Sequence, residues 1–392
     1  MKKTIKKQFL ASLFLVGLVA PGAGQVPKEK GHSFSLGEFQ KDKAFTPLVG
    51  VQSWVTYSMH EVRNDEEYAN RFNASFRRLR FGAKGSPYKW LSYEFELSLD
   101  RLGEDNYAAI KGSYKGLEVW KAYLTAKLSK NDLVHLHAGY YWAAISRDFN
   151  TSSWTVSSFD KTAADGFLRN FLTGKINGIE SGLGFGGLKN WNGFGLSYRI
   201  GAYSPAAYAG KQHFNPLLTG RLILSIGDPE QATYNYMLCG NHWNKRNGLS
   251  IGFGGARQGS VDTGTVFDCS KAYGADLMAS LGGFKLEGEY YKMKRELGGS
   301  AGFDGTEWFV RCGYNFRFKT TLVEPTLTYD YYEGDGDKAL FNYIGNDETF
   351  DVGINWHLNK DKLKIALHYL NQQGSASSSL GDLIGMSLQM RL

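Results

Sequence analysis

The last part of the sequence alternates between apolar and polar residues with a period of two. Between Thr349 and Leu358, every second residue is apolar, and the pattern returns at 361–371 and again at 381–392. Because successive side chains of a strand point to opposite faces, each of these segments has one apolar and one polar face. Since the sequence ends on such a strand, we expect this strand to pair with the first one and close a barrel, which has no open edges.

The same alternation predicts about sixteen strands in residues 47–392. Tight turns and long polar loops alternate between them, with one exception at 228–246. This layout is typical of an all-β transmembrane antiparallel up-and-down barrel with an apolar outside and a polar, water-filled inside. Residues 228–246 are either an ordered insertion at the end with the short turns or an extra hairpin, which would raise the count to eighteen. The predicted strands are 47–60, 71–85, 88–100, 116–129, 132–142, 177–188, 191–203, 218–227, 247–258, 271–282, 283–296, 304–319, 320–332, 348–359, 361–371 and 381–392.

The N-terminus indicates export. Four lysines precede an apolar stretch at 9–20, and small residues follow at 21–24, which predicts a signal peptide over residues 1–24 that is cleaved before Gln25. No later run of about 18 apolar residues could form a membrane helix. We therefore expect a periplasmic N-terminal segment at 25–46, a barrel at 47–392, and a location in the outer membrane of a Gram-negative bacterium.

Composition supports a barrel, although a soluble all-β enzyme could share it. The chain has 48 Gly, 8 Pro, 25 Phe, 23 Tyr and 9 Trp, which suits alternating strands with aromatic girdles. The net charge of +7 falls to +3 without the four signal-peptide lysines (41 basic, 38 acidic), so it says little about a substrate. The spacing of Cys239, Cys269 and Cys312 matches no metal motif, and no catalytic set stands out. We expect no enzyme activity, metal, cofactor or nucleic-acid partner.

The polar phase of the strands places charges of both signs in the lumen. A change of phase between Phe76 and Leu79 predicts a bulge near Arg77, whose side the pattern does not define. Mixed charges predict a field across the pore, and the alternative is a set of solvated charges without selectivity. The inward acids are Glu94, Glu96, Glu180, Glu287, Glu289, Glu324, Asp330 and Asp351. The candidate pore-lining and anion-contact residues are Arg77, Arg78, Arg80, Lys84, Lys121, Lys127, Arg311 and Arg317.

The long connection at 143–176 is a candidate constriction loop. A loop of this length is usually functional or disordered. Its aromatic residues, Trp154, Phe159, Phe167 and Phe171, would allow it to pack against the barrel wall, and a mobile outer loop is the alternative. Its basic residues are Arg147, Lys161, Arg169 and Lys175.

Several segments resemble the porin O and P family, which is often described as phosphate-selective. They are FRRLRFG at 76–82, YKWLSYEFELSLD at 88–100, VGINWHLNKDKLKIALHYLNQQ at 352–373 and GDLIGMSLQMRL at 381–392, together with Asn150-Thr151-Ser152 and Asp160-Lys161. The resemblance implies a sixteen-stranded trimeric porin whose third loop folds into the lumen. The family's phosphate-specific members carry an arginine ladder and a lysine cluster. Arg77 and Arg78 match the ladder, Lys161 matches a basic residue of the loop, and Tyr140 replaces another basic residue.

Together these features predict a porin through which small polar or anionic solutes, phosphate among them, diffuse passively. The expected partners are membrane lipid, the solutes and further copies of the chain in a homotrimer. The alternative is a barrel subunit of a larger outer-membrane complex, with residues 228–246 as the contact for another outer-membrane protein.

Overall fold

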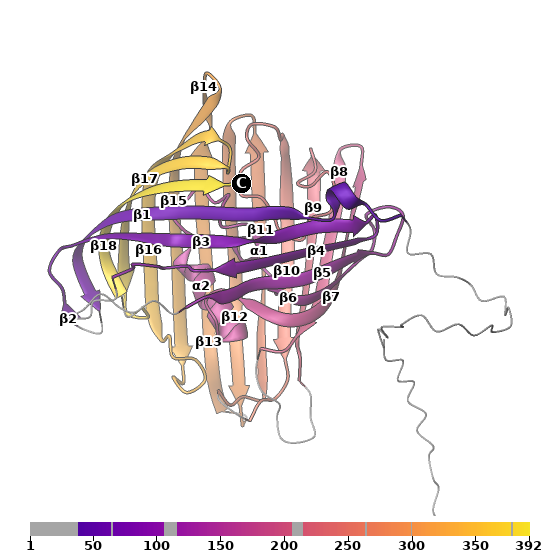
Figure 1. The fold of residues 1–392 in the computed structure, drawn as a ribbon. Helices are drawn as coiled ribbons and strands as arrows, with labels where there is room; N and C mark the ends of the chain where they lie inside the picture. The colour runs from indigo at the N-terminus through magenta and orange to yellow at the C-terminus, as the bar shows by residue number, and fades with distance from the viewer. Residues whose placement is uncertain are drawn as a thin grey trace, which may run out of the picture. The chain divides into compact units, whose positions relative to one another are not determined.

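The strands form one closed antiparallel sheet (Figure 1). The computed structural model describes residues 38–392 except 64–65, 106–115, 206–214, 263–264, 299 and 378. The predicted signal peptide and most of the predicted segment 25–46 therefore lie outside the described residues. The described residues form eighteen strands, and two of them, β2 and β14, are short additions, which leaves sixteen in the wall. The barrel closes because β1 pairs with β3 on one side and with β18 on the other.

The elements follow the chain around the barrel. Each wall strand pairs with its neighbours in sequence, and β2 and β14 extend the hairpins beside them. Among the described residues, neither α-helix is long and apolar enough to cross a membrane. The bounds are η1 (Lys41–Lys43), β1 (Thr46–Arg63), β2 (Glu66–Glu67), β3 (Arg71–Tyr88), β4 (Leu91–Ser98), β5 (Glu118–Lys127), β6 (His135–Trp142), α1 (Arg147–Asn150), α2 (Ala163–Thr173), β7 (Ile179–Trp191), β8 (Phe194–Tyr203), β9 (Leu217–Gly227), β10 (Gly248–Gln258), β11 (Cys269–Leu281), β12 (Phe284–Leu297), β13 (Ser300–Tyr314), β14 (Phe316–Phe318), β15 (Thr321–Gly336), β16 (Gly345–Asn359), β17 (Leu363–Gly374) and β18 (Ser379–Arg391).

All sixteen predicted strands are present, with shifts at their ends. The turn between β3 and β4 falls at 89–90 and not at 86–87, because the register shifts between Gly85 and Tyr88 and β3 continues past the expected turn. The predicted tight turn at 130–131 lies within a longer connection at 128–134. The hairpin considered at 228–246 does not form, so the alternative of eighteen wall strands is wrong. All three cysteines are unpaired.

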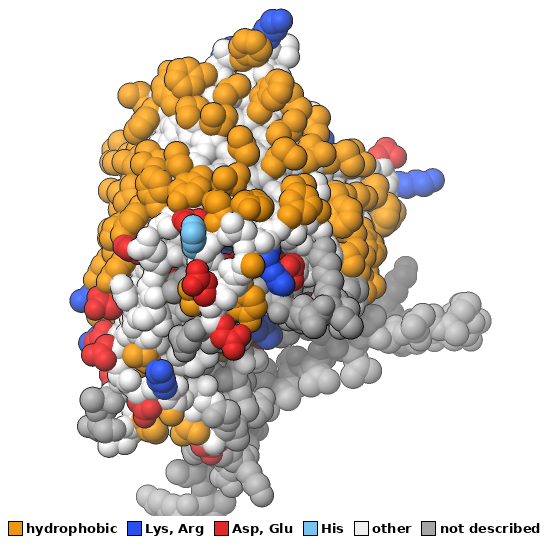
Figure 2. All heavy atoms as spheres, turned by 90° about the vertical axis from the view of Figure 1, so that its left-hand side faces the viewer, with side chains coloured by type: hydrophobic (Ala, Val, Ile, Leu, Met, Phe, Trp, Pro, Cys, Tyr) orange, Lys and Arg blue, Asp and Glu red, His pale blue; other side chains and the backbone are white. Residues whose placement is uncertain are grey.

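The outer face of the wall is apolar, as the alternation predicts. On β16, Val352 and Ile354 are exposed, whereas Asp351 and Asn355 are buried on the inner side. The face in Figure 2 carries its hydrophobic side chains over the upper part, and its Asp, Glu, Lys and Arg side chains gather mainly below, toward the long loops. We call the two ends of the barrel the short-turn end and the loop end.

An arginine on the outer face should destabilise the barrel in lipid. We expect Ile354→Arg, whose side chain is half exposed on the outer face, to cost roughly 2–4 kcal/mol of unfolding free energy in bilayers. Glu118→Arg is the matched control, because Glu118 is exposed and faces the lumen, and its cost should stay within about 0.5 kcal/mol. Reversible unfolding from lipid vesicles in denaturant measures both values. Equal costs would show that the apolar face does not contact lipid.

Candidate functional site

The third long connection, which we call loop three (residues 143–178), folds into the barrel. Side-chain caps fix its two short helices: Ser146 accepts the N–H of Phe149 at the start of α1, and Thr162 accepts the N–H of Asp165 at the start of α2. Both of these caps are themselves buried. The prediction that this connection is ordered and packs against the wall is therefore confirmed.

Wall carboxylates hold loop three in place by accepting its backbone N–H groups. Asp351 accepts from Phe159 at 2.7 Å, Glu289 from Asp148 at 2.9 Å, and Asp330 from Ala164 at 3.1 Å. Three carboxyl groups of the wall therefore fix loop three at three points along its length.

The five inward acids on β12, β15 and β16 are all buried, so the expectation that they line an open pore is wrong. Loop three covers these acids, which leaves the basic residues to dominate the open space. These acids are Glu287, Glu289, Glu324, Asp330 and Asp351.

Aromatic side chains add an apolar contact between loop three and the wall. Phe167 stacks on Tyr332 with ring centroids 3.9 Å apart, and Phe171 packs against Phe303 at 5.5 Å. Such pairs add about 0.5–1.5 kcal/mol to the gain from burial. Loop three is thus fixed by both hydrogen bonds and packing.

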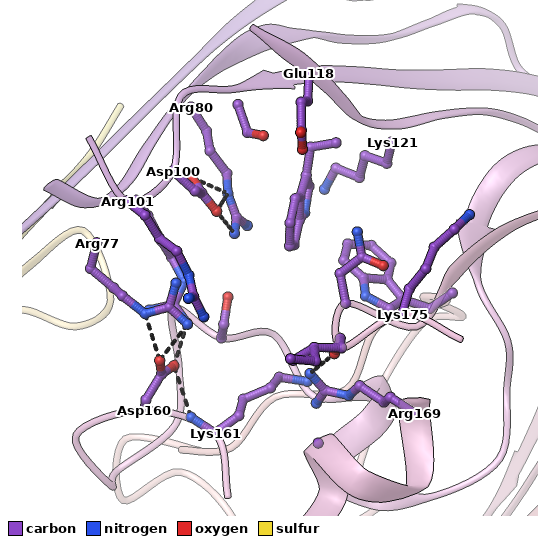
Figure 3. Close-up of a pocket in the computed structure, with 18 of the residues that line it drawn as sticks. Arg77, Arg80, Asp100, Arg101, Glu118, Lys121, Asp160, Lys161, Arg169 and Lys175 are labelled. Carbon is purple, nitrogen blue, oxygen red and sulfur yellow. Dashed lines mark hydrogen bonds and ion pairs between the residues drawn. The ribbon is translucent and has the colours of Figure 1, made fainter. Parts of the chain in front are cut away.

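A cavity of about 690 Å³ remains between loop three and the wall formed by β1 and β3–β6. We call it the passage, and Figure 3 shows the charged residues around it. Basic side chains outnumber acidic ones there by ten to five. The basic residues are Arg63, Arg77, Arg78, Arg80, Arg101, Lys121, Lys161, Arg169, Lys175 and Arg391, and the acidic ones are Asp100, Glu104, Asp105, Glu118 and Asp160.

A bulge directs two consecutive arginines into the passage. Gln52 of β1 pairs with Arg78 and the next residue, Ser53, pairs with Phe76, so Arg77 is the extra residue in β3. The predicted bulge is confirmed. Because of it, Arg77 faces the lumen together with Arg78. Without the bulge, neighbouring residues on a strand would point to opposite faces.

Asp160 of loop three receives both of these arginines. Its carboxylate lies 2.6 Å from Arg77 (Figure 3), and it also pairs with Arg78. Burial alone would raise the pKa of Asp160, but the two guanidinium groups outweigh it and hold the pKa well below its usual range. Asp160 therefore stays ionised and ties loop three to β3.

Arg80 is held by a carboxylate and an aromatic ring. It pairs with Asp100 at 2.5 Å, and its Cζ lies 3.6 Å from the centroid of the Trp120 ring. A cation over an indole face is attracted by the ring electrons. The guanidinium is thus fixed in position before any solute arrives.

The predicted site residues divide into two groups. Seven of them line the passage: Arg77, Arg78, Arg80, Lys121, Lys161, Arg169 and Lys175. Five do not line the passage: Lys84, Lys127, Arg147, Arg311 and Arg317.

Each of the five has a physical reason for its place. Arg147 of loop three and Arg311 of β13 are fully buried in ion pairs, with Glu230 at 2.6 Å and Asp148 at 3.3 Å respectively. Lys127 pairs with Asp132 in the connection at 128–134. Lys84 is exposed near the short-turn end of β3, and Arg317 is exposed on β14, which extends the β13–β15 hairpin beyond the rim of the barrel (Figure 1).

Some lining residues were not predicted. Arg101 and Asp100 follow β4 at the start of a connection, where alternation no longer defines a side. Arg391 also lines the passage, and its inward side follows from the alternation of the last strand. Within the described part of the chain, no group of three or more His, Cys, Asp or Glu residues is arranged to hold a metal ion.

Lys161 should make anion preference depend on pH. Its Nζ donates to the carbonyl oxygens of Asp148 and Phe149, and burial, together with Arg169, lowers the pKa of Lys161 to about 7. The lysine is a cation below this pH and neutral above it, so we expect the anion-to-cation permeability ratio to fall as pH rises through 7. Reversal potentials across this range measure the change. Lys161→Arg should keep the ratio high at both ends, and a step that persists in this variant would assign the titration to another group.

Comparisons with known proteins agree with this architecture. Residues 246–392 match the model of a family described as phosphate-selective porin O and P, which confirms the resemblance over that part of the chain. No curated protein matches the sequence significantly.

Solved porins share the fold at low sequence identity. An anion-selective porin from Comamonas acidovorans is 14% identical with a TM-score of 0.58, over 89% of this chain and 99% of that one. OmpF of Salmonella typhi, in a complex with daunomycin, is 10% identical with a TM-score of 0.58, over 91% and 100%. The outer membrane channel DcaP of Acinetobacter baumannii is 10% identical with a TM-score of 0.54, over 91% and 99%. The family match and the fold support an outer-membrane porin, a channel rather than an enzyme.

Proposed function

We propose that this porin allows passive diffusion of small anionic solutes, with inorganic phosphate among the candidates. The observation that carries the proposal is the ten-to-five excess of basic over acidic side chains around the passage. Walls of low dielectric constant concentrate such a field and raise the local concentration of anions. The arginines suit oxyanions in particular, because guanidinium offers a planar, bidentate donor pair.

The acids of the passage moderate this preference. Asp160 and Asp100 each neutralise part of the arginine charge, and Lys121 lies 2.6 Å from Glu94 and 2.9 Å from Glu96. A fully paired cation attracts a passing anion less than a free one does. We therefore propose a general preference for small anions, and neutral polar solutes pass more slowly.

Solute flux into proteoliposomes tests this function. Swelling rates would be compared for solutes of equal size, a neutral sugar and its carboxylate or phosphate derivative, with empty vesicles as the control. The proposal expects faster entry of the anionic member of each pair. Absence of swelling with every solute would refute the porin function, and equal rates would refute the anion preference alone.

The same proposal includes assembly and location. We propose a cleaved signal peptide over residues 1–24, a periplasmic segment at 25–46, insertion into outer-membrane lipid, and a homotrimer. A trimeric form is described for OmpT of Vibrio cholerae, 12% identical with a TM-score of 0.51 over 89% of this chain and 100% of that one. Light scattering of the detergent-purified protein tests the trimer, and N-terminal sequencing tests cleavage before Gln25.

Residues 228–246 suggested a role as a subunit of a larger complex, but their structure does not support that role. Within residues 228–246, Tyr236 is buried, and Tyr234 stacks on His135 of β6 with ring centroids 4.4 Å apart. These aromatic side chains are used inside the barrel and are not presented to another protein.

A further inference from the structure

The segment 228–246, which joins β9 to β10 at the short-turn end, enters the lumen; we call it the inner segment. Most connections at this end are short, whereas this one has buried residues along its length, including Glu230, Tyr236, Leu238 and Asn241. Its burial requires partners inside the barrel. It finds them both on loop three and on the wall.

The inner segment is joined to loop three by backbone and side-chain bonds. The N–H of Leu238 donates to the carbonyl oxygen of Asn150 at 2.9 Å, and the N–H of Ser152 donates to the carbonyl oxygen of Leu238 at 3.1 Å. Glu230 accepts two hydrogen bonds from the guanidinium of Arg147, at 2.6 and 3.0 Å. The arginine holds the pKa of Glu230 well below its usual range although burial opposes this. The two connections, which start at opposite ends of the barrel, therefore meet as one unit.

Polar groups of the wall fix the same segment from the outside. The amide of Asn241 donates to Asn315 and to Glu324, at 3.2 Å in each case. Lys285 donates to the carbonyl oxygen of Gly240 at 2.8 Å and to Ser157 of loop three. Removing one partner of a buried network leaves the others unpaired, which is costly. The inner segment is accordingly held in one position.

Among the described residues, little space remains between the inner segment and the wall of β7–β9. The cavity between it and the wall of β7–β9 measures about 10 Å³ and is lined by Leu188, Ser197 and Ile223 among others. A space of that size holds about one water molecule. On its other side the segment borders the passage through Met237.

We propose that the inner segment is the second wall of the passage, opposite β3–β5, and that Met237 is a specificity-determining residue. This inference rests on the proposed porin function and deepens it. Loop three alone does not define the open cross-section, because the inner segment fills the part of the lumen beside β7–β9. A charge at position 237 would face the same space as Arg80 and Lys121.

Charge substitutions at Met237 test the inference without removing any buried hydrogen-bonding side chain. Met237→Glu should lower the anion-to-cation permeability ratio about two- to threefold, and Met237→Lys should raise it by a similar factor. Thr233→Glu and Thr233→Lys are matched controls, because Thr233 is exposed on the same segment and does not line the passage. We expect the control pair to leave the ratio within the error of the wild type.

Reversal potentials of single channels in a salt gradient provide the readout. Unchanged values for both Met237 variants in a wild-type barrel that conducts would overturn the inference and leave the porin function intact. A wild-type barrel without conductance would refute the porin function itself. A shift of the Thr233 variants as large as that of the Met237 variants would also overturn the inference, since the effect would then be a general surface charge.

Shortening the inner segment provides an independent measurement. Replacing residues 231–245 by a short glycine-serine turn should raise conductance at least about twofold, because the space beside β7–β9 opens to ions while loop three keeps its wall contacts. Conductance at the wild-type value in a correctly folded variant would overturn the inference. If the shortened chain does not insert into the membrane, the two Met237 variants alone test the inference.

Discussion

Removing the lumenal part of loop three should raise single-channel conductance several-fold. The variant would replace residues 147–175 by a short glycine-serine linker. The loop occupies the lumen with two helices and a buried aromatic cluster, so its loss would widen the path for ions. The wall should persist, because each wall strand keeps its backbone ladder with both neighbours.

The control for this deletion is a change in an outer connection. Replacing residues 66–68 by glycine alters the connection between β1 and β3, where Glu66 and Glu67 are exposed, and should leave conductance unchanged. Single-channel recordings in planar bilayers measure both variants. Conductance at the wild-type value after the loop-three replacement would mean that the loop does not limit the current.

Neutralising three cations of the passage should lower the anion-to-cation permeability ratio on the order of tenfold below pH 7, where Lys161 is a cation. The variant combines Arg77→Gln, Arg101→Gln and Lys161→Gln, which reduces the basic lining residues from ten to seven against five acids. A unit charge about 8 Å from a passing ion contributes roughly 1 kcal/mol at an effective dielectric constant near 40. Screening by salt and by the remaining ion pairs reduces the summed interaction energy of the three charges.

The matched control removes the same charge outside the passage. Lys89, Lys130 and Lys245 are exposed at connections of the short-turn end and do not line the passage. Changing all three to glutamine should leave the permeability ratio near the wild-type value. Equal shifts in the two triple variants would attribute the selectivity to the net charge of the protein.

The wall of the barrel could be predicted because its strands carry apolar side chains on the outer face and polar ones on the inner face. That pattern repeats at each strand, so residues such as Val352 and Asp351 reveal their sides by position alone. The same logic located the bulge at Arg77, since an extra residue is visible as a change of phase between Phe76 and Leu79. Aromatic residues in loop three correctly indicated that it packs against the wall.

Alternation could not predict which inward charged residues line the open passage and which are covered by loop three. Alternation shows that Glu289, Asp330 and Arg311 face inward, but not that loop three covers them. Whether such a side chain faces water or a folded loop depends on contacts between segments more than 100 residues apart, for example Glu289 with Asp148. The path of the inner segment was equally hidden, because it lacks the period of a strand and its burial depends on partners such as Arg147 and Asn315.

The reversal potential of the wild-type channel in a salt gradient tests the central claim most directly. The measurement would use purified protein in a neutral planar bilayer with potassium chloride at different concentrations on the two sides. An excess of cations around the passage predicts a potential whose sign reports faster movement of chloride than of potassium. A potential of zero, or one of the opposite sign, would contradict the proposed preference for anions.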